Sequence, residues 1–486
     1  MPNRMHGVEI PSGSLLIGGD RIARTDTGVR EQIDPSNGEV LAPITLAGPA
    51  EVDQAVDAAR AAFPEWRAID PSVRRDLIMR FADLVDEQFE QLSVLRSLEL
   101  GAPKKRGTGL NMAVEYMRYF AGWVDKIEGS TVPVNGAALN YTIPEPYGVV
   151  AALTPWNGGV VSAAMKVVPA LVAGNCVVLK PSELAALAPL RFGELAHEAG
   201  LPNGVLSVIP GGIPAGEALV AHPGVNKISF TGGTITARHV MAGAATNLTP
   251  VILELGGKSA NVVFADADLT AAVQTTVYLA LAGMSGQGCV LPTRLLVQAD
   301  VFDEVIKLVV DMTNSIKVGR PFDQGVQAGP VITADACERI LRTIDDARTR
   351  GDGELCAGGH RIGGDLANGY FIEPTVFTDV DNTSPLAQEE VFGPVLSVVR
   401  FSDEDDAVAK ANDSAFGLGG LVFTNDVKRA HRLAGALEVG SVGVNAFAPM
   451  PPNVPFGGVK QSGYGREGGL AGVSEFLQPK NVYVGL

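Results

Sequence analysis

Val149-Val150-Ala151-Ala152-Leu153 is a short apolar run that ends in the polar segment Thr154-Pro155-Trp156-Asn157. A helical pattern follows at 160–172, and a second apolar run begins at Cys176. Short apolar runs that alternate with helices of this length are typical of right-handed β-α-β units and a parallel sheet. The alternation continues, and further strands are expected at 205–209, 227–230 and 251–255. Ligands of such sheets bind outside the carboxyl ends of the strands, which directs attention to the residues that follow each run.

A second alternating series indicates another α/β unit that begins near Gly256. Helices are expected at 334–350 and 404–412, and the Pro- and Gly-rich stretch 451–469 follows the last strand. The strands of this unit are expected at 262–264, 294–297, 395–401, 421–423 and 441–445. Before the first series, helical patterns occupy 51–66, 71–98 and 110–127, while 130–147 has the pattern of an extended hairpin. A final strand is expected in 473–484.

Composition excludes several classes of protein. The 486 residues carry a formal charge of −16, which disfavours nucleic acid and anionic membranes as partners. The first ten residues have no apolar segment of a secretory signal, and no uninterrupted apolar span is long enough for a transmembrane helix. None of the four cysteines has metal-type spacing, so no metal site is expected. We expect a soluble, cytoplasmic protein.

One cysteine stands in a loop of small residues, Ser285-Gly286-Gln287-Gly288-Cys289. A cysteine nucleophile needs a carbonyl to attack, a donor for the oxyanion and a base for later water activation. Asn157 can supply an amide donor, and Glu254, among apolar neighbours, should have the raised pKa that suits a base. The structural alternatives are a turn or cap for Asn157 and a buried salt bridge for Glu254.

Two apparent nucleotide motifs fail on context. The segment 463–468 fits the dinucleotide fingerprint, but it follows a polar loop and too little chain remains for a β-α-β unit. Gly257-Lys258-Ser259 matches the last three residues of the phosphate-binding loop motif, but Ile252 stands where that motif requires its first glycine.

From about residue 15 to the end, the chain resembles the aldehyde dehydrogenase superfamily. Each matching segment is weak alone, but together, in order and at compatible spacing, they are very specific. The segments are Pro155-Trp156-Asn157, Lys180-Pro181-Ser182-Glu183, Phe230-Thr231-Gly232, Leu253-Glu254-Leu255-Gly256-Gly257-Lys258, Gly286-Gln287-Gly288-Cys289, Glu390-Val391-Phe392-Gly393-Pro394 and Pro455-Phe456-Gly457-Gly458.

The resemblance implies NAD(P)-linked oxidation of an aldehyde to the carboxylic acid. It implies that Cys289 attacks the aldehyde, that Asn157 and the Cys289 N–H hold the oxyanion, and that Glu254 activates the water that hydrolyses a thioester. Lys166 and Glu467 match positions linked in the family to proton relay.

The resemblance also implies a set of cofactor-binding residues. Lys180 and Glu183 match residues that hold the adenosine ribose, whereas Glu390 and Phe392 match residues at the nicotinamide ribose. Because Glu183 would repel a 2′-phosphate, NAD is preferred over NADP, which stays possible. The further residues of the set are Thr154, Pro155, Trp156, Ser182, Gly232, Gly233 and Leu255.

By this resemblance the chain has two Rossmann-like open-sheet α/β domains and a small β oligomerisation arm. Residues 1–129 with 148–255 form the cofactor-binding domain, and residues 256–445 form the catalytic domain. Residues 446–470 are a return segment that lines the cleft, and residues 130–147 with 471–486 form the arm. Since a projecting hairpin exposes strand edges, a homodimer or homotetramer is expected.

The substrate is the least defined aspect of the function. Five residues match segments that line the family's substrate tunnel and favour an apolar or aromatic aldehyde, although some could be core residues: Met112, Tyr116, Phe120, Met284 and Phe447. No arginine flanks Cys289, which disfavours a semialdehyde bearing a carboxylate, but Arg118 could reach in. Gly158, Gly159, Gly233 and Gly443 replace bulkier or polar family residues and suggest looser packing near the cleft.

Two other functions stay open. CoA-acylating relatives transfer the acyl group to CoA, but they generally lack the base that Glu254 would provide. A catalytically idle binding scaffold would not need Asn157, Glu254 and Cys289 together.

Overall fold

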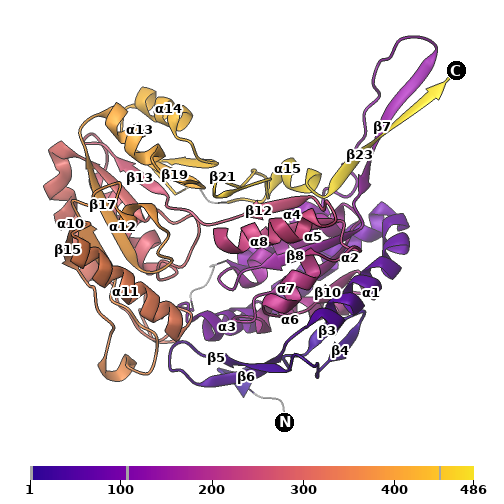
Figure 1. Cartoon of the computed structure of the whole chain (residues 1–486), viewed down its shortest axis with the longest axis horizontal. Helices are drawn as coiled ribbons and strands as arrows, with labels where there is room; N and C mark the ends of the chain where they lie inside the picture. Colours follow the sequence, from indigo (N-terminus) through magenta and orange to yellow (C-terminus); the bar gives the residue numbers. More distant parts are fainter. Residues whose placement is uncertain (1–3, 105–108, 448–449) are drawn as a thin grey trace.

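Two open sheets organise the chain. The computed structural model describes residues 4–104, 109–447 and 450–486. The first sheet has the order β22-β12-β11-β8-β9-β10-β3-β4, and its five central strands are parallel (Figure 1). These central strands are β8 (Val149–Thr154), β9 (Cys176–Pro181), β10 (Leu206–Val208), β11 (Lys227–Thr231) and β12 (Val251–Glu254). The sequence predicted all five, and each is within two residues of its expected position.

The order of these strands creates a switch point at β8. From β8 the chain proceeds to β9 and β10 on one side, and β11 and β12 are added on the other side. A ligand crevice is expected at the carboxyl ends on either side of such a reversal. The segments that follow β8 and β11 therefore adjoin this crevice.

Helices pack on this sheet. α5 (Gly159–Val172) is buried over almost its whole length against β8 and β9, which is why it is apolar apart from Lys166 and Ser162. The predicted helix 71–98 is interrupted at Gln88, giving α2 (Pro71–Glu87) and α3 (Phe89–Leu100). The other helices packed here are α1 (Pro49–Ala68), α4 (Leu110–Ala121), α6 (Leu187–Glu198), α7 (Ile213–Val220) and α8 (Thr234–Ala245).

The second sheet has the order β15-β16-β17-β14-β13-β19-β20 and is parallel except at β15 (Glu354–Ala357). Its parallel strands are β13 (Ala260–Val263), β14 (Arg294–Gln298), β16 (Thr375–Thr378), β17 (Val395–Phe401), β19 (Gly419–Phe423) and β20 (Ser441–Val444). α11 (Ala334–Arg350) and α13 (Glu404–Asn412) have the predicted bounds. The predicted α/β fold class with two Rossmann-like sheets is confirmed.

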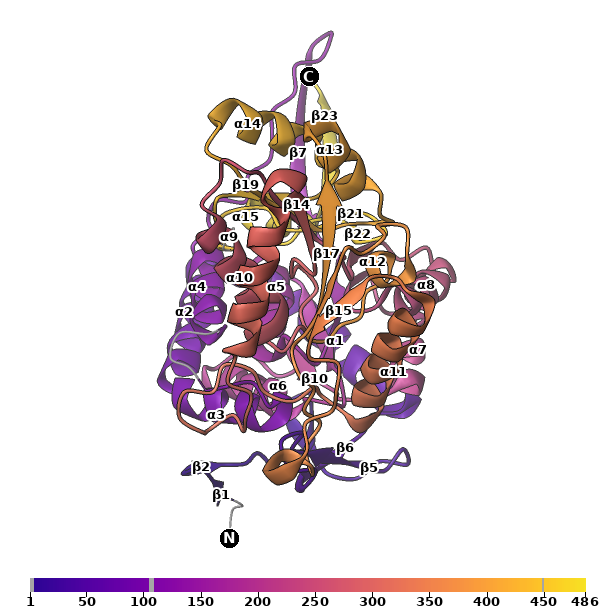
Figure 2. The same ribbon diagram turned by 90° about the vertical axis from the view of Figure 1, so that its left-hand side faces the viewer.

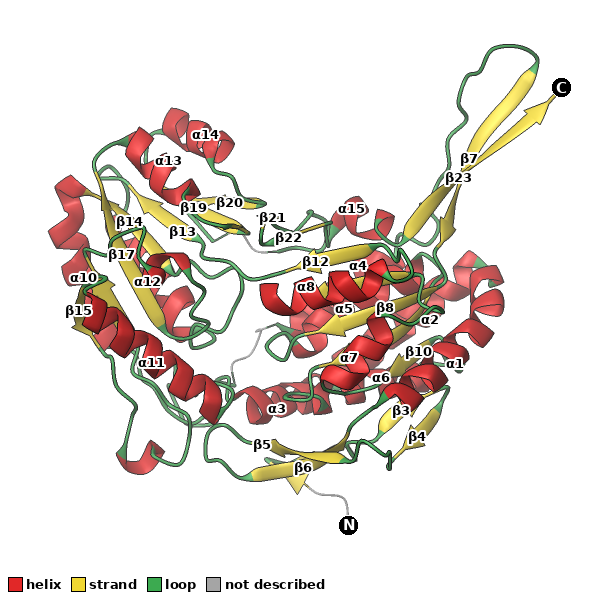
Figure 3. Ribbon diagram, in the orientation of Figure 1, coloured by secondary structure: helices red, strands yellow, loops and turns green. Residues whose placement is uncertain are grey.

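A two-stranded arm projects from the body (Figures 1 and 3). β7 (Ala138–Pro146) pairs antiparallel along its whole length with β23 (Leu477–Gly485). The expected hairpin within 130–147 is thus only partly right: the main partner of β7 is the C-terminal strand, and the early residues of the segment add one bridge, Thr131 to Tyr141. Figure 2 shows the arm standing out at one end of the molecule.

The segment after β20 adds a separate two-stranded sheet and one edge strand of the first sheet. β21 (Val459–Lys460) pairs with β18 (Phe416–Gly417), whereas β22 (Gly463–Tyr464) pairs with β12 at the edge of the first sheet. Residues 448–449 of the predicted return segment lie outside the described residues. The N-terminal hairpins, β3 (Leu15–Ile17) with β4 (Asp20–Ile22) and β5 (Val29–Ile33) with β6 (Val40–Thr45), were not expected from the sequence.

Candidate active site

The loop of Cys289 lies beside Asn157. Asn157 follows β8, and its Nδ2 donates a hydrogen bond of 2.9 Å to the backbone oxygen of Gln287, two residues before Cys289. An uncharged amide donor is thereby placed next to the sulfur's loop. The structure brings together two residues that are far apart in the sequence and that were both predicted to be catalytic.

The Cys289 loop is fixed from the other side by hydrogen bonds. The Gln287 side chain accepts from the Ile332 N–H at 2.9 Å, and Ser285 Oγ donates to the Gly329 oxygen at 2.9 Å. Gly286 has a φ of +71°, and a Cβ there would collide with the Gly393 carbonyl, so only glycine fits. These bonds hold the nucleophile candidate in one place.

The surroundings of Cys289 favour the protonated form of its thiol. Burial raises the pKa of the Cys289 thiol to about 12, and the nearby carboxylates Glu390 and Glu254 contribute in the same direction. Because the thiolate is the nucleophile, the thiol must lose its proton before it attacks.

Glu254 ends β12 with its carboxyl group buried at 3% exposure, and neither oxygen has a hydrogen-bond partner among the described residues. Burial, and then the charge of Glu467, raise the pKa of Glu254 well above its ordinary value. A Cβ on Gly457 would lie 2.6 Å from Glu254 Oε1, so glycine at 457 leaves room for the carboxyl. The predicted alternative, a buried salt bridge, is not formed by Glu254 within the described residues.

A buried ion pair lies near Glu254. Lys166 Nζ is 2.6 Å from Glu467 Oε1 and donates to Ser229 Oγ at 3.0 Å. The two side chains are only 1% and 8% exposed. The charge of Glu467 raises the pKa of Glu254, whereas the charge of Lys166 lowers it. Ser229, on β11, belongs to this group and was missed by the sequence analysis.

A cavity of about 500 Å³ lies at the carboxyl ends of β8, β9 and β11. Ile213, Glu217 and His239 line it. It is also lined by the predicted cofactor residues Thr154, Pro155, Trp156, Lys180, Ser182, Glu183, Gly232 and Gly233. The size suits a dinucleotide's adenosine half.

The chemistry of this cavity fits NAD. Lys180 and Glu183 offer a donor and acceptors for a ribose diol, and burial lowers the pKa of Lys180 while Glu183 opposes that effect. The Thr154 hydroxyl is buried without a hydrogen-bond partner among the described residues. Gly233 precedes α8, and a Cβ there would meet no atom within 4 Å, so the N–H groups at this helix start stay open to a phosphate.

Glu390, Phe392 and Trp156 connect the two sheets. Glu390 Oε1 accepts the Gly257 N–H at 3.0 Å. The Phe392 and Trp156 rings meet edge to face, with centroids 5.6 Å apart. Leu255 is buried beside this loop, and its N–H donates to the Ser462 oxygen. Phe392 thus adjoins the cavity through Trp156, whereas Glu390 and Leu255 lie at the loop that begins with Gly256 and Gly257.

Tyr116 and Phe120 are fully buried with packed rings, whereas Met112, Met284 and Phe447 are half-buried, and the expectation that these five residues line a substrate tunnel stays a prediction. Two other sequence expectations are wrong. Arg118 pairs with the surface carboxylates Asp83 and Asp86 and does not reach the site. A side chain at Gly158 would collide with Ser162, so the packing there is tight, while Gly159 and Gly233 are open as expected.

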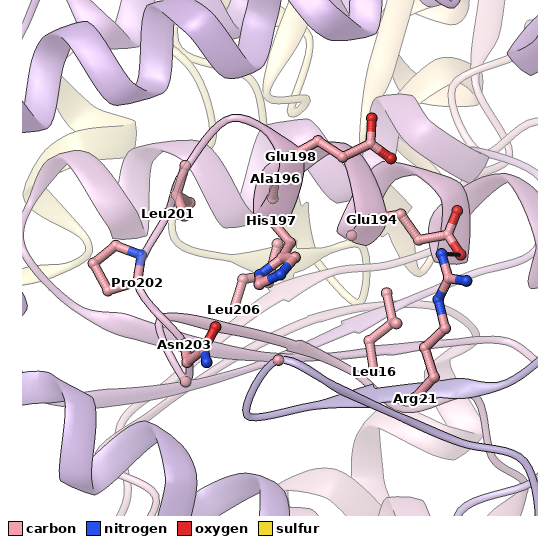
Figure 4. A pocket seen from close by; sticks show the side chains of 13 residues that line it. Leu16, Arg21, Glu194, Ala196, His197, Glu198, Leu201, Pro202, Asn203 and Leu206 are labelled. Carbon is pink, nitrogen blue, oxygen red and sulfur yellow. Dashed lines mark ion pairs between the residues drawn. The ribbon is translucent and has the colours of Figure 1, made fainter.

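A second hollow, of about 100 Å³, lies between α6, the loop after it and the β3–β4 hairpin (Figure 4). Its charged side chains satisfy one another: Arg21 pairs with Glu194 at 2.8 Å, and Arg191 bonds both Glu194 and Glu198. His197 and Asn203 also line it. It contains none of the residues that converge on Cys289.

Comparisons with known proteins agree with this geometry. The Aldehyde dehydrogenase family model matches residues 22–482. Betaine aldehyde dehydrogenase of Rhizobium leguminosarum bv. trifolii is 41% identical, over 98% of each chain. Among solved structures, a putative aldehyde dehydrogenase from Burkholderia cenocepacia matches with a TM-score of 0.95 and 40% identity, covering 98% of this chain and 97% of that one. Betaine aldehyde dehydrogenase of Staphylococcus aureus, in complex with NAD+, matches with a TM-score of 0.95 and 36% identity, covering 98% and 95%.

The matched family and the related structure with NAD+ bound place the chain among the NAD(P)-linked oxidoreductases. The chain belongs to the aldehyde dehydrogenase family, and it is an NAD(P)-dependent aldehyde dehydrogenase. The predicted family is confirmed. Among the described residues, no helix has the length and apolar character needed to cross a membrane.

Proposed function

We propose that this enzyme oxidises an apolar or aromatic aldehyde to the free carboxylic acid through a covalent adduct of Cys289, with NAD as the preferred acceptor. The observation that carries the proposal is the Asn157 hydrogen bond to Gln287, which puts an oxyanion donor beside the Cys289 loop. The buried, unpaired carboxyl of Glu254 supports it, because its charge acts on the Cys289 thiol.

Three residues of the chain would carry out the steps of the reaction. After the Cys289 thiol has released its proton to water, the thiolate adds to the aldehyde carbon to form a thiohemiacetal, and Asn157 Nδ2 with the Cys289 N–H donates to the oxyanion. Bound NAD would supply the hydride acceptor, and the thiohemiacetal would become a thioester on Cys289. Glu254 then takes a proton from a water molecule, which attacks the thioester carbonyl and releases the acid and the Cys289 sulfur.

The raised pKa of Glu254 suits the role of a base. Burial and the charge of Glu467 make its carboxylate a stronger base towards water than an ordinary carboxylate. Lys166 and Glu467 then pass the proton away from Glu254. The support for this relay is that both charges act on Glu254 and that the two residues are joined by a buried 2.6 Å ion pair.

Cofactor choice follows from the charges of the 500 Å³ cavity. Glu183 and Glu217 both line it, and either carboxylate would repel the 2′-phosphate of NADP. Lys180 is the cation among the lining residues that could offset them. NAD is therefore preferred, while NADP is a possible, weaker acceptor.

Assembly, domain roles and location complete the proposal. Residues 1–129 and 148–255 bind the cofactor, residues 256–445 supply the nucleophile, and residues 446–470 close the cleft. The arm formed by 130–147 and 471–486 joins subunits into a homodimer or homotetramer, since β7 and β23 expose strand edges. The enzyme works in the cytoplasm without nucleic acid or membrane partners, in keeping with its charge of −16.

NADH formation with a panel of aliphatic, aromatic, terpenoid and semialdehyde substrates tests the proposal. We expect turnover with apolar or aromatic aldehydes, a lower KM for NAD than for NADP, and free acid as product in the absence of CoA. Cys289→Ala should abolish the activity, with Cys356→Ala as the matched control. A strict need for CoA would favour the acylating alternative, and activity retained by Cys289→Ala would contradict the nucleophile.

A further inference from the structure

Ser229 is a fully buried serine in the middle of β11, and Lys166 Nζ donates a hydrogen bond of 3.0 Å to its hydroxyl oxygen. The central strands of a parallel sheet are covered on both faces and are usually almost wholly apolar. β11 departs from this rule, because Lys227, Ser229 and Thr231 alternate with apolar residues. Since residues two apart in a strand point to the same face, one face of β11 is polar.

The polar face of β11 lies on the same side of the sheet as Glu254. β11 and β12 are parallel, with Thr231 the register partner of Glu254 and Ser229 the partner of Ile252. Register partners on neighbouring parallel strands point to the same side of the sheet. Ser229 is therefore one strand over and two residues back from Glu254, which separates their Cα atoms by about 8 Å at the usual strand spacing and rise per residue.

Lys166 links this face of the sheet to Glu467. The lysine belongs to α5, and its ammonium is 2.6 Å from Glu467 Oε1. The backbone of Glu467 is held by two hydrogen bonds with Phe456, of 2.6 and 2.7 Å. Among the described residues, Glu467 and Ser229 are the two whose side chains accept hydrogen bonds from the ammonium. Ser229 is therefore the contact that ties the Lys166–Glu467 pair to the sheet.

The ammonium of Lys166 depends on this contact for a fixed position. An ammonium has three N–H donors and ends a flexible stem, so a single acceptor leaves it free to turn about that contact. The Lys166 side chain is only 1% exposed, and bulk water does not replace a lost acceptor there. Without the Ser229 hydroxyl, the positive charge and the Glu467 carboxylate bound to it would no longer be fixed relative to Glu254.

We propose that Ser229 is a positioning residue for the hydrolytic step: its hydroxyl holds the Lys166 ammonium, and through it the Glu467 carboxylate, in a fixed place relative to Glu254. Ser229 acts through Lys166 and not on the aldehyde or the sulfur. The inference rests on the proposed relay of Lys166 and Glu467.

The step can be measured on the full chain as the loss of an acyl group from Cys289. The Cys289 thiolate attacks the carbonyl of p-nitrophenyl acetate, and p-nitrophenolate leaves; water then attacks the thioester and releases acetic acid and the Cys289 thiol. The acetyl-enzyme is freed of excess ester by rapid gel filtration, and its decay is followed by intact-protein mass spectrometry. Cys289→Ala shows how much of the acetyl adduct is on other side chains.

Ser229→Ala removes the hydroxyl oxygen and little volume. We expect the acetyl group to be lost about tenfold more slowly, the usual effect of a lost hydrogen bond to a charged group, with the rate of acylation changed less than about twofold. Ser207→Ala is the matched control, because Ser207 is an equally buried serine on β10 of the same sheet and its hydroxyl has no partner among the described residues. A merely structural serine would instead give a lower thermal midpoint with unchanged hydrolysis.

A double-mutant cycle with Lys166→Met isolates the proposed route. In the Lys166→Met background, Ser229→Ala should slow hydrolysis no further. Ser229→Cys, which has a similar size and a weaker acceptor, serves as a second variant if the alanine form does not fold. Unchanged hydrolysis in the Ser229 variant that folds, or an equal slowing in the Lys166→Met background, would overturn the proposal.

The acyl group comes from the ester, so the result does not depend on aldehyde, NAD or CoA. A wild-type enzyme that hydrolyses its acetyl group but passes the acyl group of an aldehyde only to CoA would refute the proposed function and leave this cycle interpretable. An enzyme that makes free acid from aldehydes and is insensitive to Ser229→Ala would refute only the role of Ser229.

Discussion

The buried pair of Lys166 and Glu467 gives a stability prediction that can be worked from the structure. With side chains 1% and 8% exposed, both groups have lost nearly all their water, and their 2.6 Å contact replaces it. Lys166→Met removes the cation and leaves Glu467 buried beside Glu254. Breaking a buried pair in this way costs about 3–5 kcal/mol, because one charge stays uncompensated.

The second mutation should restore most of that loss. Lys166→Met combined with Glu467→Gln has no buried charge at either position, so we expect an unfolding free energy within about 1–2 kcal/mol of the wild type. Ser229 Oγ, which accepts from Lys166 Nζ, is left without that donor in both variants and so cancels in the comparison.

Urea unfolding followed by circular dichroism measures the three free energies, with Lys480→Met on the exposed arm as the control. Thioester hydrolysis should be slowed in the single and the double variant alike, because both break the proton relay. If the double variant is as unstable as Lys166→Met alone, the loss came from packing and not from the uncompensated charge, and the reasoning is wrong.

Three further predictions concern the catalytic loop. Glu254→Gln should slow steady-state turnover by about 10²–10⁴-fold, yet leave a burst of NADH near one per active site in stopped-flow traces; absence of the burst would place Glu254 in an earlier step. Because the pKa of Cys289 is raised to about 12 in this structure, its alkylation by iodoacetamide without NAD should accelerate about tenfold per pH unit from 7 to 10, and a plateau near pH 8 would contradict this. Gly286→Ala, at a φ of +71° and against the Gly393 carbonyl, should lower the thermal midpoint and the alkylation selectivity for Cys289, whereas Gly363→Ala, which meets no atom within 4 Å, should not.

The central strands were predictable because burial on both faces makes each a short, nearly continuous apolar run. β8 and β17 show this most clearly, and their bounds were expected to within one residue. The β3–β4 hairpin was not predictable, because its strands are only three residues long, which is too short for a clear alternation of apolar and polar residues. The break between α2 and α3 at Gln88 was not predicted either, because the sequence there contains neither glycine nor proline.

Site residues could be predicted where the chemistry of a position allows few residue types. A cysteine between glycines and a glutamate inside an apolar strand stand out, and the structure places Asn157, Cys289 and Glu254 near one another. Ser229 provided no signal because one serine in a strand is common.

The pairing of β7 with β23 has a consequence for how the protein is made. The partner of β7 leaves the ribosome about 330 residues later, which at 5–20 residues per second leaves the β7 edge unpaired for roughly 15–70 s. During that time the nascent chain exposes a nine-residue strand that could pair with another chain. Glu467 and Gly457, which complete the surroundings of Glu254, also arrive near the end of synthesis. The chain is therefore most open to aggregation while it is still inactive, and a chaperone that covers β7 would protect it until the C-terminal strand emerges.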